Sequence, residues 1–331
     1  MPLPILYIIV PCFNEEEVLP ASSALLLDEL QTLAENGLVD ADGSRILFVD
    51  DGSSDATWAI IDDLATRDGR CLGLRLSRNR GHQNALIAGM EEARGNCDIA
   101  ITIDADGQDD ESVMAAMVEA YANGCDVVYG VRRNRDSDTA FKRVTARWFY
   151  RLMSAMGCEI VSEHADFRLM SARVLDALAE YEEVNLFLRG MVPLVGFSST
   201  SVAYDRRARL AGRSRYPISN MISLAWEGIT SLSVRPLRIA TALGIVISAL
   251  SFVGIIWVVV TKLMGNAIAG WASMTAIQLF IAGIQLIVLG IIGEYVGKTY
   301  LEAKRRPRYF VSERSGSPAE THVDAERPNG Q

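Results

Sequence analysis

Two long stretches without a charged side chain lie near the C-terminal end of the chain. Residues 239–261 are 23 consecutive uncharged residues between Arg238 and Lys262, and residues 274–293 are 20 more that end at Glu294. About 20 mostly apolar residues span the hydrocarbon core of a bilayer as a helix, so both stretches are predicted to be transmembrane helices. The loop between them is short, and the two helices are expected to form a hairpin. The alternative is a pair of buried helices in a soluble core.

Basic residues are concentrated on the outer flanks of this hairpin. Arg235 and Arg238 precede it and five Lys or Arg residues follow it between 298 and 308, whereas the loop holds only Lys262. Because Lys and Arg are retained on the cytoplasmic side of membranes, both termini are expected to be cytoplasmic and the protein to lie in the inner (plasma) membrane. The two stretches and their basic flanks divide the chain into four expected segments. They are a cytosolic domain at 1–215, an interfacial helix at 216–235, the two spans within 236–297, and a tail at 298–331 that is disordered after about 312.

The charge distribution divides the chain in a similar way. Residues 1–199 carry 17 Lys and Arg against 33 Asp and Glu, residues 200–331 carry 15 against 8, and the whole chain has a net charge of −9. An acidic front half argues against a nucleic-acid partner. Five scattered cysteines and three histidines argue against a zinc site, and His82 and His164 are too isolated in the sequence to indicate a catalytic or ligand role.

Short β-rich runs alternate with helix-compatible stretches in the first 131 residues. The runs are Leu6–Val10, Ile46–Val49, Leu72–Leu76, Ile99–Ile103 and Val127–Val131, and the stretches between them include Val18–Leu33, Ala56–Ala65 and Ser112–Ala122. Such alternation predicts an α/β fold with a mostly parallel sheet that is covered by helices on both faces. No G-x-G-x-x-G occurs, so the fingerprint of a nicotinamide-dinucleotide site is absent.

Each of the five runs is followed by a polar cluster. The clusters are Pro11–Glu16, Asp50–Asp55, Ser77–Gly81, Asp104–Gln108 and Arg132–Arg135. Ligands of parallel sheets bind beyond the carboxyl ends of the strands, where these clusters are expected to meet. One such cluster alone is explained by turn and capping chemistry, but five at one edge indicate a binding site.

Asp104 and Asp106 are separated by one residue at the end of the fourth run. Two carboxylates in this position suit a hard divalent cation, Mg²⁺ or Mn²⁺, whose remaining ligands are substrate phosphates and water. Such an ion would neutralise a leaving diphosphate. An acidic loop without a metal is the alternative at this point.

In this order, Val10–Glu15, Asp50–Ser53 and Asp104–Gln108 resemble the motifs of glycosyltransferase family 2, whose members have the GT-A fold. The continuation narrows the resemblance to polyprenyl-phosphate glycosyltransferases, which include bactoprenol glucosyltransferases and relatives of dolichol-phosphate mannosyl synthase. The residues that carry this narrower resemblance are Ala165–Met170, Arg209-x-x-Gly212-x-Ser214-Arg215, the hairpin and Glu302–Pro307. It covers residues 5 to 311. The sequence departs from the family pattern at Gly107, where a bulky residue is usual, and at Arg215, where lysine is common.

The resemblance implies a role for individual residues. The nucleotide sugar would be bound by Pro11, Phe13, Glu15, Asp50, Asp51, Asp104, Ala105 and Arg132, and the metal by Asp104, Asp106 and Gln108. The lipid phosphate would be met by Arg206, Arg209, Ser214 and Arg215, and Asp106 and Asp166 would be the catalytic carboxylates. The implied reaction moves a sugar from a nucleotide donor, with uridine favoured over guanosine, to the phosphate of a membrane polyprenol such as undecaprenol. The reaction is expected to be a single displacement with inversion. The resemblance also implies that the enzyme is a homo-oligomer.

The segment before the hairpin is predicted to contact the membrane. Five arginines between 206 and 215 precede a stretch in which Ile218, Ile222, Trp226 and Ile229 recur at helical spacing. A basic cluster beside an apolar stripe is typical of an interfacial segment that meets anionic headgroups. Two other functions stay open: a processive polysaccharide synthase, and a non-catalytic partner in the translocation of lipid-linked sugars.

Overall fold

The computed structural model describes residues 2–133, 156, 164–184, 187–205, 207, 229–231, 233–264 and 270–316. These residues form two compact units. One unit contains the front part of the chain together with the residues from Pro307 onward, and the other contains the two long helices and the residues just before them.

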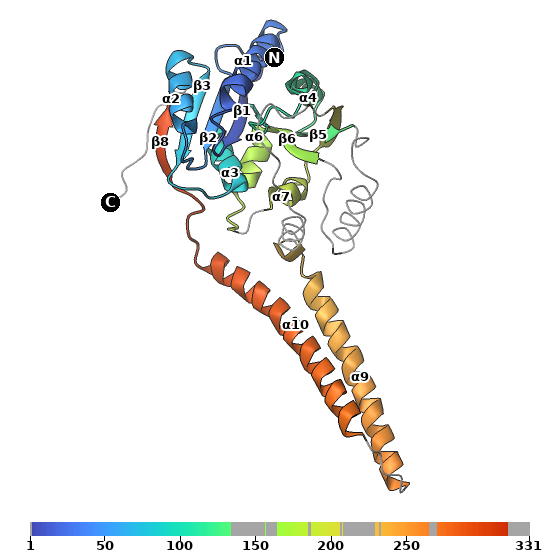
Figure 1. Ribbon diagram of the computed structural model, residues 1–331. Coiled ribbons are helices and arrows are strands. Elements are labelled where there is room, and N and C mark those ends of the chain that lie inside the picture. Colours follow the sequence, from blue (N-terminus) through green and yellow to red (C-terminus); the bar gives the residue numbers. More distant parts are fainter. Residues whose placement is uncertain are drawn as a thin grey trace, which may run out of the picture. The chain divides into compact units, whose positions relative to one another are not determined.

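The first unit is built around one sheet of eight strands, in the order β7-β5-β6-β4-β1-β2-β3-β8 (Figure 1). The strands are β1 (Leu6–Cys12), β2 (Arg45–Asp50), β3 (Cys71–Leu76), β4 (Ile99–Thr102), β5 (Val127–Arg132), β6 (His164–Ser171), β7 (Ser199–Tyr204) and β8 (Val311–Ser315). The helices are α1 (Leu19–Glu35), α2 (Thr57–Arg67), α3 (His82–Ala93), η1 (Glu111–Val113), α4 (Met114–Ala122), α6 (Ala172–Ala179) and α7 (Leu188–Leu194).

The five predicted strands run in the same direction. β1 pairs parallel with β2 and β4, and β2 pairs parallel with β3. β6 is antiparallel to both β4 and β5, so β5 has the direction of β4. The prediction of a mostly parallel sheet is confirmed, and the carboxyl ends of all five strands lie at one edge. The amino end of β6 lies at this same edge, because β6 runs the opposite way.

Both faces of the sheet are buried. In β1, Leu6, Ile8 and Val10 point to one face, where they pack with residues of α1, α2 and α4. Tyr7 and Ile9 point to the other face, which is covered by α3, α6 and α7. Side chains of a strand alternate between the faces, so a strand that is buried on both faces is apolar throughout. This is why each predicted strand appears in the sequence as a continuous apolar run.

The tail departs from the prediction. Residues 312–315 were expected to be disordered, but they belong to β8, which pairs antiparallel with β3. Arg75 of β3 lies 2.7 Å from Glu313, and Arg314 lies 2.8 Å from Glu92 of α3. β8 has no apolar run because its side chains are mostly exposed. Its strand conformation depends on pairing with the open edge of β3, and the composition of residues 311–315 alone does not indicate this pairing.

The second unit contains α9 (Arg235–Leu263) and α10 (Trp271–Ala303). By length and composition both are apolar enough to cross a membrane, with candidate spans at Arg235–Gly254 and Phe280–Ala303. These helices include the two predicted stretches, 239–261 and 274–293. Near the cytosolic end expected for α10, Lys298 Nζ donates to Thr230 Oγ1 at 2.6 Å, and Tyr295 Oη donates to the Ser233 carbonyl at 2.5 Å. These bonds connect α10 to the segment that enters α9.

Candidate active site

Two loops meet at the carboxyl ends of β2 and β3. Gly52 has a φ of +70°, and a Cβ atom there would lie 2.5 Å from the carbonyl carbon of Arg78, so only glycine allows this approach. The Asp51 carboxylate accepts hydrogen bonds from the amides of Arg80 and Gly81, at 2.7 and 2.8 Å. Asp51, a predicted nucleotide-binding residue, therefore also fixes the turn from which α3 begins.

Asp50 and the first loop lie beside this turn. Asp50 is fully buried, its Oδ1 accepts from the Ser53 amide at 3.0 Å, and its Oδ2 lies 3.3 Å from Arg75 Nε without hydrogen-bond geometry. Glu15 donates its amide to Thr57 Oγ1 at 2.9 Å. Among the other predicted nucleotide-binding residues of this loop, Pro11 is buried in β1, and the Phe13 side chain is 44% exposed.

The predicted metal loop follows β4. Asp106 is 8% exposed and its Oδ1 accepts from the Gln108 amide at 3.1 Å, while Ala105 is buried behind it. The pKa of Asp104 is raised to about 6. Burial is the largest cause, the carboxylates of Asp166, Asp109 and Asp106 act in the same direction, and His82 lowers the pKa. Carboxylates that repel one another in a partly buried loop favour a bound cation, because the cation removes their mutual repulsion.

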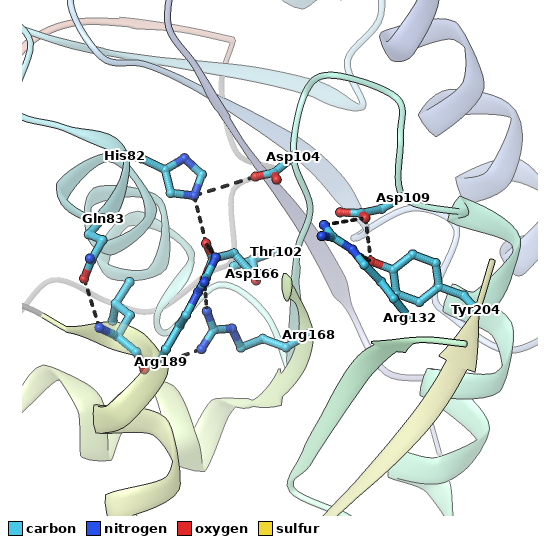
Figure 2. Close-up of polar contacts among 11 residues, drawn as sticks. His82, Gln83, Thr102, Asp104, Asp109, Arg132, Asp166, Arg168, Arg189 and Tyr204 are labelled. Atoms are coloured by element: carbon cyan, nitrogen blue, oxygen red, sulfur yellow. Dashed lines mark hydrogen bonds and ion pairs between the residues drawn. The ribbon is translucent and has the colours of Figure 1, made fainter. Parts of the chain in front are cut away.

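Asp166 of β6 lies in a cluster of cationic side chains (Figure 2). Arg168 Nη2 donates to its Oδ1 at 2.6 Å, and Arg189 Nη2 donates to its Oδ2 at 3.1 Å. Burial raises the pKa of Asp166, but hydrogen bonding to His82 and the charges of the two arginines outweigh burial and hold this pKa well below its usual range. The Asp166 carboxylate is therefore ionised.

His82 connects the two carboxylate groups. Its Nε2 lies 3.4 Å from Asp166 Oδ2 and 3.6 Å from Asp104 Oδ1, as Figure 2 shows. Sequence reasoning missed this residue because it judged His82 as an isolated histidine. The signal was its position: His82 directly follows the polar cluster Ser77–Gly81 and is the first residue of α3.

Arg132 belongs to a second group of contacts. Its Nη2 lies 3.4 Å from Asp109 Oδ1 and its Nε donates to Tyr204 Oη at 3.3 Å, while Tyr204 Oη donates to Asp109 Oδ1 at 2.5 Å. Asp109 and Tyr204 are both buried. Sequence reasoning missed both, although Asp109 adjoins the predicted metal loop.

The metal loop is also bonded to the chain just beyond β7. Arg207 donates its amide to the Gln108 carbonyl at 2.8 Å, and its guanidinium donates to Glu111 at 2.6 Å and to Asp110 at 2.8 Å. The four predicted acceptor residues, Arg206, Arg209, Ser214 and Arg215, lie outside the described residues. The first of them immediately precedes Arg207.

The residues present fit a divalent cation of the Mg²⁺ or Mn²⁺ type. Asp104 and Asp106 supply hard carboxylate oxygens within three residues, and Gln108 supplies an amide oxygen from the same loop. Within the part of the chain that the structure describes, no three His, Cys, Asp or Glu residues converge as a complete metal cage. An ion at this loop would take its remaining ligands from water or from substrate phosphates.

Comparison with protein families agrees with this geometry. Residues 7–179 match the family described as Glycosyl transferase family 2, and residues 235–299 match the GtrB C-terminal hairpin. The chain belongs to glycosyltransferase family 2. This membership confirms the resemblance found in the sequence, and with it the GT-A fold and the assignment as an enzyme.

Similar proteins extend over almost the whole of this family 2 glycosyltransferase. The uncharacterised glycosyltransferase YkoT of Bacillus subtilis (strain 168) is 50% identical over 93% of this chain and 91% of its own length. The bactoprenol glucosyl transferase of Shigella phage SfX is 38% identical over 93% of this chain and 98% of its own length. Among solved structures, mannosyl-3-phosphoglycerate synthase from Rubrobacter xylanophilus has a TM-score of 0.47 at 16% identity, over 71% of this chain and 74% of that one.

Proposed function

We propose that this glycosyltransferase moves a hexose from a nucleotide diphosphate sugar, UDP-linked rather than GDP-linked, to the phosphate of a membrane polyprenol such as undecaprenol. One observation carries the proposal: the Asp104–Asp106 loop and the Asp166–Arg189 pair meet across His82 at the carboxyl edge of the sheet. This edge offers carboxylates for a metal–diphosphate and guanidinium groups for a second phosphate. The relatives named as bactoprenol glucosyl transferases and the matching hairpin support a lipid acceptor.

Asp104, Asp106 and Gln108 would hold the metal ion, which supplies positive charge to the leaving diphosphate when it is bound. Arg132 is positioned by Asp109 and Tyr204 to contact the same diphosphate. The loops that contain Pro11, Phe13, Glu15, Asp50 and Asp51 lie at the same edge and form the nucleoside side of the site. The buried Asp50 Oδ2, which lacks a hydrogen bond within the described residues, is an acceptor for a donor N–H of the base.

The acceptor needs no strong base in this reaction. A phosphate monoester has a second pKa of about 6 and is already mostly dianionic at neutral pH. Asp166 is ionised and bonded to two arginines, so its role is to hold cationic groups in place around the acceptor rather than to remove a proton. The acceptor oxygen then attacks the anomeric carbon opposite the leaving diphosphate, which gives inversion.

The chain would act at the inner membrane as a multi-pass protein. α9 and α10 cross the bilayer, residues 1–215 and the tail are cytoplasmic, and 216–235 lies at the interface. The predicted basic residues Arg206, Arg209 and Arg215, with Ser214, would meet lipid phosphate there. The protein is proposed to pack as a homo-oligomer through its spans.

Membranes that contain the chain, incubated with labelled sugar nucleotides and undecaprenyl phosphate, test the proposal. A panel of UDP- and GDP-sugars with Mg²⁺ or Mn²⁺ is expected to give one labelled product that chloroform extracts. Label in a water-soluble polymer would favour a processive synthase. Absence of product with every donor, when a bactoprenol glucosyl transferase gives one in parallel, would favour a non-catalytic translocation partner.

A further inference from the structure

Three charged side chains lie opposite one another on the adjacent strands β2, β3 and β8 (Figure 1). In the register of the sheet Asp50 is paired with Arg75, and Arg75 is paired with Glu313. Directly opposed residues point to the same face of a sheet, so these side chains form a row with one cation between two carboxylates. Trp58 of α2 packs on this row: its Nε1 donates to Glu313 Oε2 at 3.1 Å, and the Arg75 guanidinium lies 5.6 Å from its ring centroid.

Arg75 contacts its two acidic neighbours unequally. Its Nη1 donates to Glu313 Oε1 at 2.7 Å, which is a short, charge-assisted hydrogen bond. Its Nε lies 3.3 Å from Asp50 Oδ2, and this oxygen accepts no hydrogen bond from any described residue. The bond to the C-terminal strand therefore directs the guanidinium toward β8 and leaves its contact with Asp50 without hydrogen-bond geometry.

The two carboxylates also differ in exposure to solvent. The Asp50 side chain is fully buried, whereas the Glu313 side chain is 51% exposed. Opposite charges attract more strongly in the interior of a protein than beside water. Without Glu313, the Arg75 guanidinium would therefore turn to Asp50 and complete a hydrogen bond to Oδ2. That bond would engage the oxygen that the proposed function gives to an N–H of the nucleotide base.

From this row of side chains we infer that Glu313 is a positioning residue for nucleotide binding: it holds Arg75 away from Asp50 and so keeps Asp50 Oδ2 available to the base of the donor. The inference rests on the proposed function, in which Asp50 accepts from the base. It gives β8 a role in substrate recognition, although Glu313 itself does not contact the substrate. Glu313 lies in the tail that was expected to be disordered, and no sequence motif of the site includes it.

Calorimetric titration of the full-length protein in detergent with Mn²⁺ tests the inference, with UDP and GDP as ligands. E313A is expected to raise the Kd of the nucleotide that the wild type binds more tightly by about tenfold, the effect of one hydrogen bond to a charged group. E313D keeps a carboxylate and is expected to bind this nucleotide more tightly than E313A does. The matched control is R314A, because Arg314 is the next residue of β8 and forms an ion pair with Glu92 of α3 at 2.8 Å. Its Kd is expected to stay within about twofold of wild type.

A double-mutant cycle shows whether Glu313 acts through Arg75. In an R75Q background, E313A is expected to change the Kd by less than about twofold, because no guanidinium is left to be held. An unchanged Kd in E313A, an equal loss in R314A, an equal effect of E313A with and without Arg75, or a wild type that binds neither nucleotide overturns the inference. If R75Q lacks the wild-type unfolding transition, the comparison of E313A with R314A decides the question. These titrations need no lipid, and the proposed function fails separately, if the wild type makes no lipid-linked product.

Discussion

At the scale of single residues, a substitution of Asp166 distinguishes a positioning role of this carboxylate from a role as catalytic base. Asp166→Asn removes the charge that holds Arg168 and Arg189 in place, and the misplacement of these groups is expected to lower turnover about 100-fold or more. Because the pKa of Asp166 lies well below its usual range, a loss of activity on acidification near pH 6 belongs to the acceptor phosphate and to Asp104, whose pKa is about 6, and not to Asp166. The variant is therefore expected to keep this acid limb in a plot of log kcat against pH. Loss of the limb would identify Asp166 as the base, and near-wild-type turnover would remove it from any essential role.

Glu29 of α1 is expected to make stability depend on pH. Its pKa is raised from 4.5 to about 7, mainly by burial, with the nearby Glu111 and Asp110 acting in the same direction. The folded state thus disfavours the charged form, and the free energy of unfolding that Glu29 contributes falls as pH rises from about 4.5 to about 7. Glu29→Gln is expected to gain thermal stability over wild type at pH 8 but not at pH 4.5. Melting curves at both values check this, and an equal difference at the two pH values would contradict it.

Tyr204 is expected to stabilise the Arg132 group. Tyr204→Phe deletes the donor to Asp109 and leaves a buried carboxylate with one partner fewer, which costs about 1–3 kcal/mol. Thermal unfolding measures the loss, and the KM for the donor is expected to rise because Arg132 is less well positioned. Tyr121→Phe on the half-buried side of α4 is the control. A melting temperature equal to that of the control would show that the hydroxyl contributes nothing.

At the scale of elements, β8 is predicted to be needed for a stable first unit. A chain that stops after Phe310 loses the pairing with β3 and the ion pairs of Glu313 and Arg314. A chain that stops after Gly316 keeps them and is the matched control. The shorter chain is expected to melt at least about 2 °C below the control and to aggregate more readily, since an open strand edge pairs with other chains. Identical melting and solubility would refute this role.

The strands that are buried on both faces could be predicted, because such a strand is a continuous apolar run in the sequence. Leu6–Val10 was predicted and Leu6–Cys12 is observed. β6, β7 and β8 were not predicted. β7 and β8 are edge strands, and their conformation comes from pairing with a neighbour rather than from an apolar run.

The clusters at the strand ends could be predicted from the sequence, and the resemblance added Asp166, but two side chains that contact Asp166 could not be predicted. Asp104 and Asp106 could be found because one loop carries both. His82 and Arg189 could not, because α3 and α7 bring them to Asp166 from positions 84 residues before it and 23 residues after it. Contacts over such separations depend on the order of strands in the sheet, which the sequence pattern left open.

At the scale of the whole molecule, the distribution of Lys and Arg predicts that both termini are cytoplasmic. Epitopes fused before Met1 and after Gln331 are expected to be protected from added protease in intact spheroplasts and cleaved in inside-out vesicles. A periplasmic protein serves as the marker of vesicle orientation. Cleavage of either epitope in intact spheroplasts would contradict this topology.

The pairing of β8 with β3 also determines when the sheet can be completed during protein synthesis. The last residue of β3 is Leu76, and the partner strand begins only at Val311, after both long helices have been synthesised. At about 5–20 residues per second, the ribosome needs roughly 10–50 s to cover that distance. During this interval β3 is an unprotected edge of the nascent sheet. The sheet of the first unit can therefore be completed only after α9 and α10 have been synthesised, although β1 to β7 precede both helices in the chain.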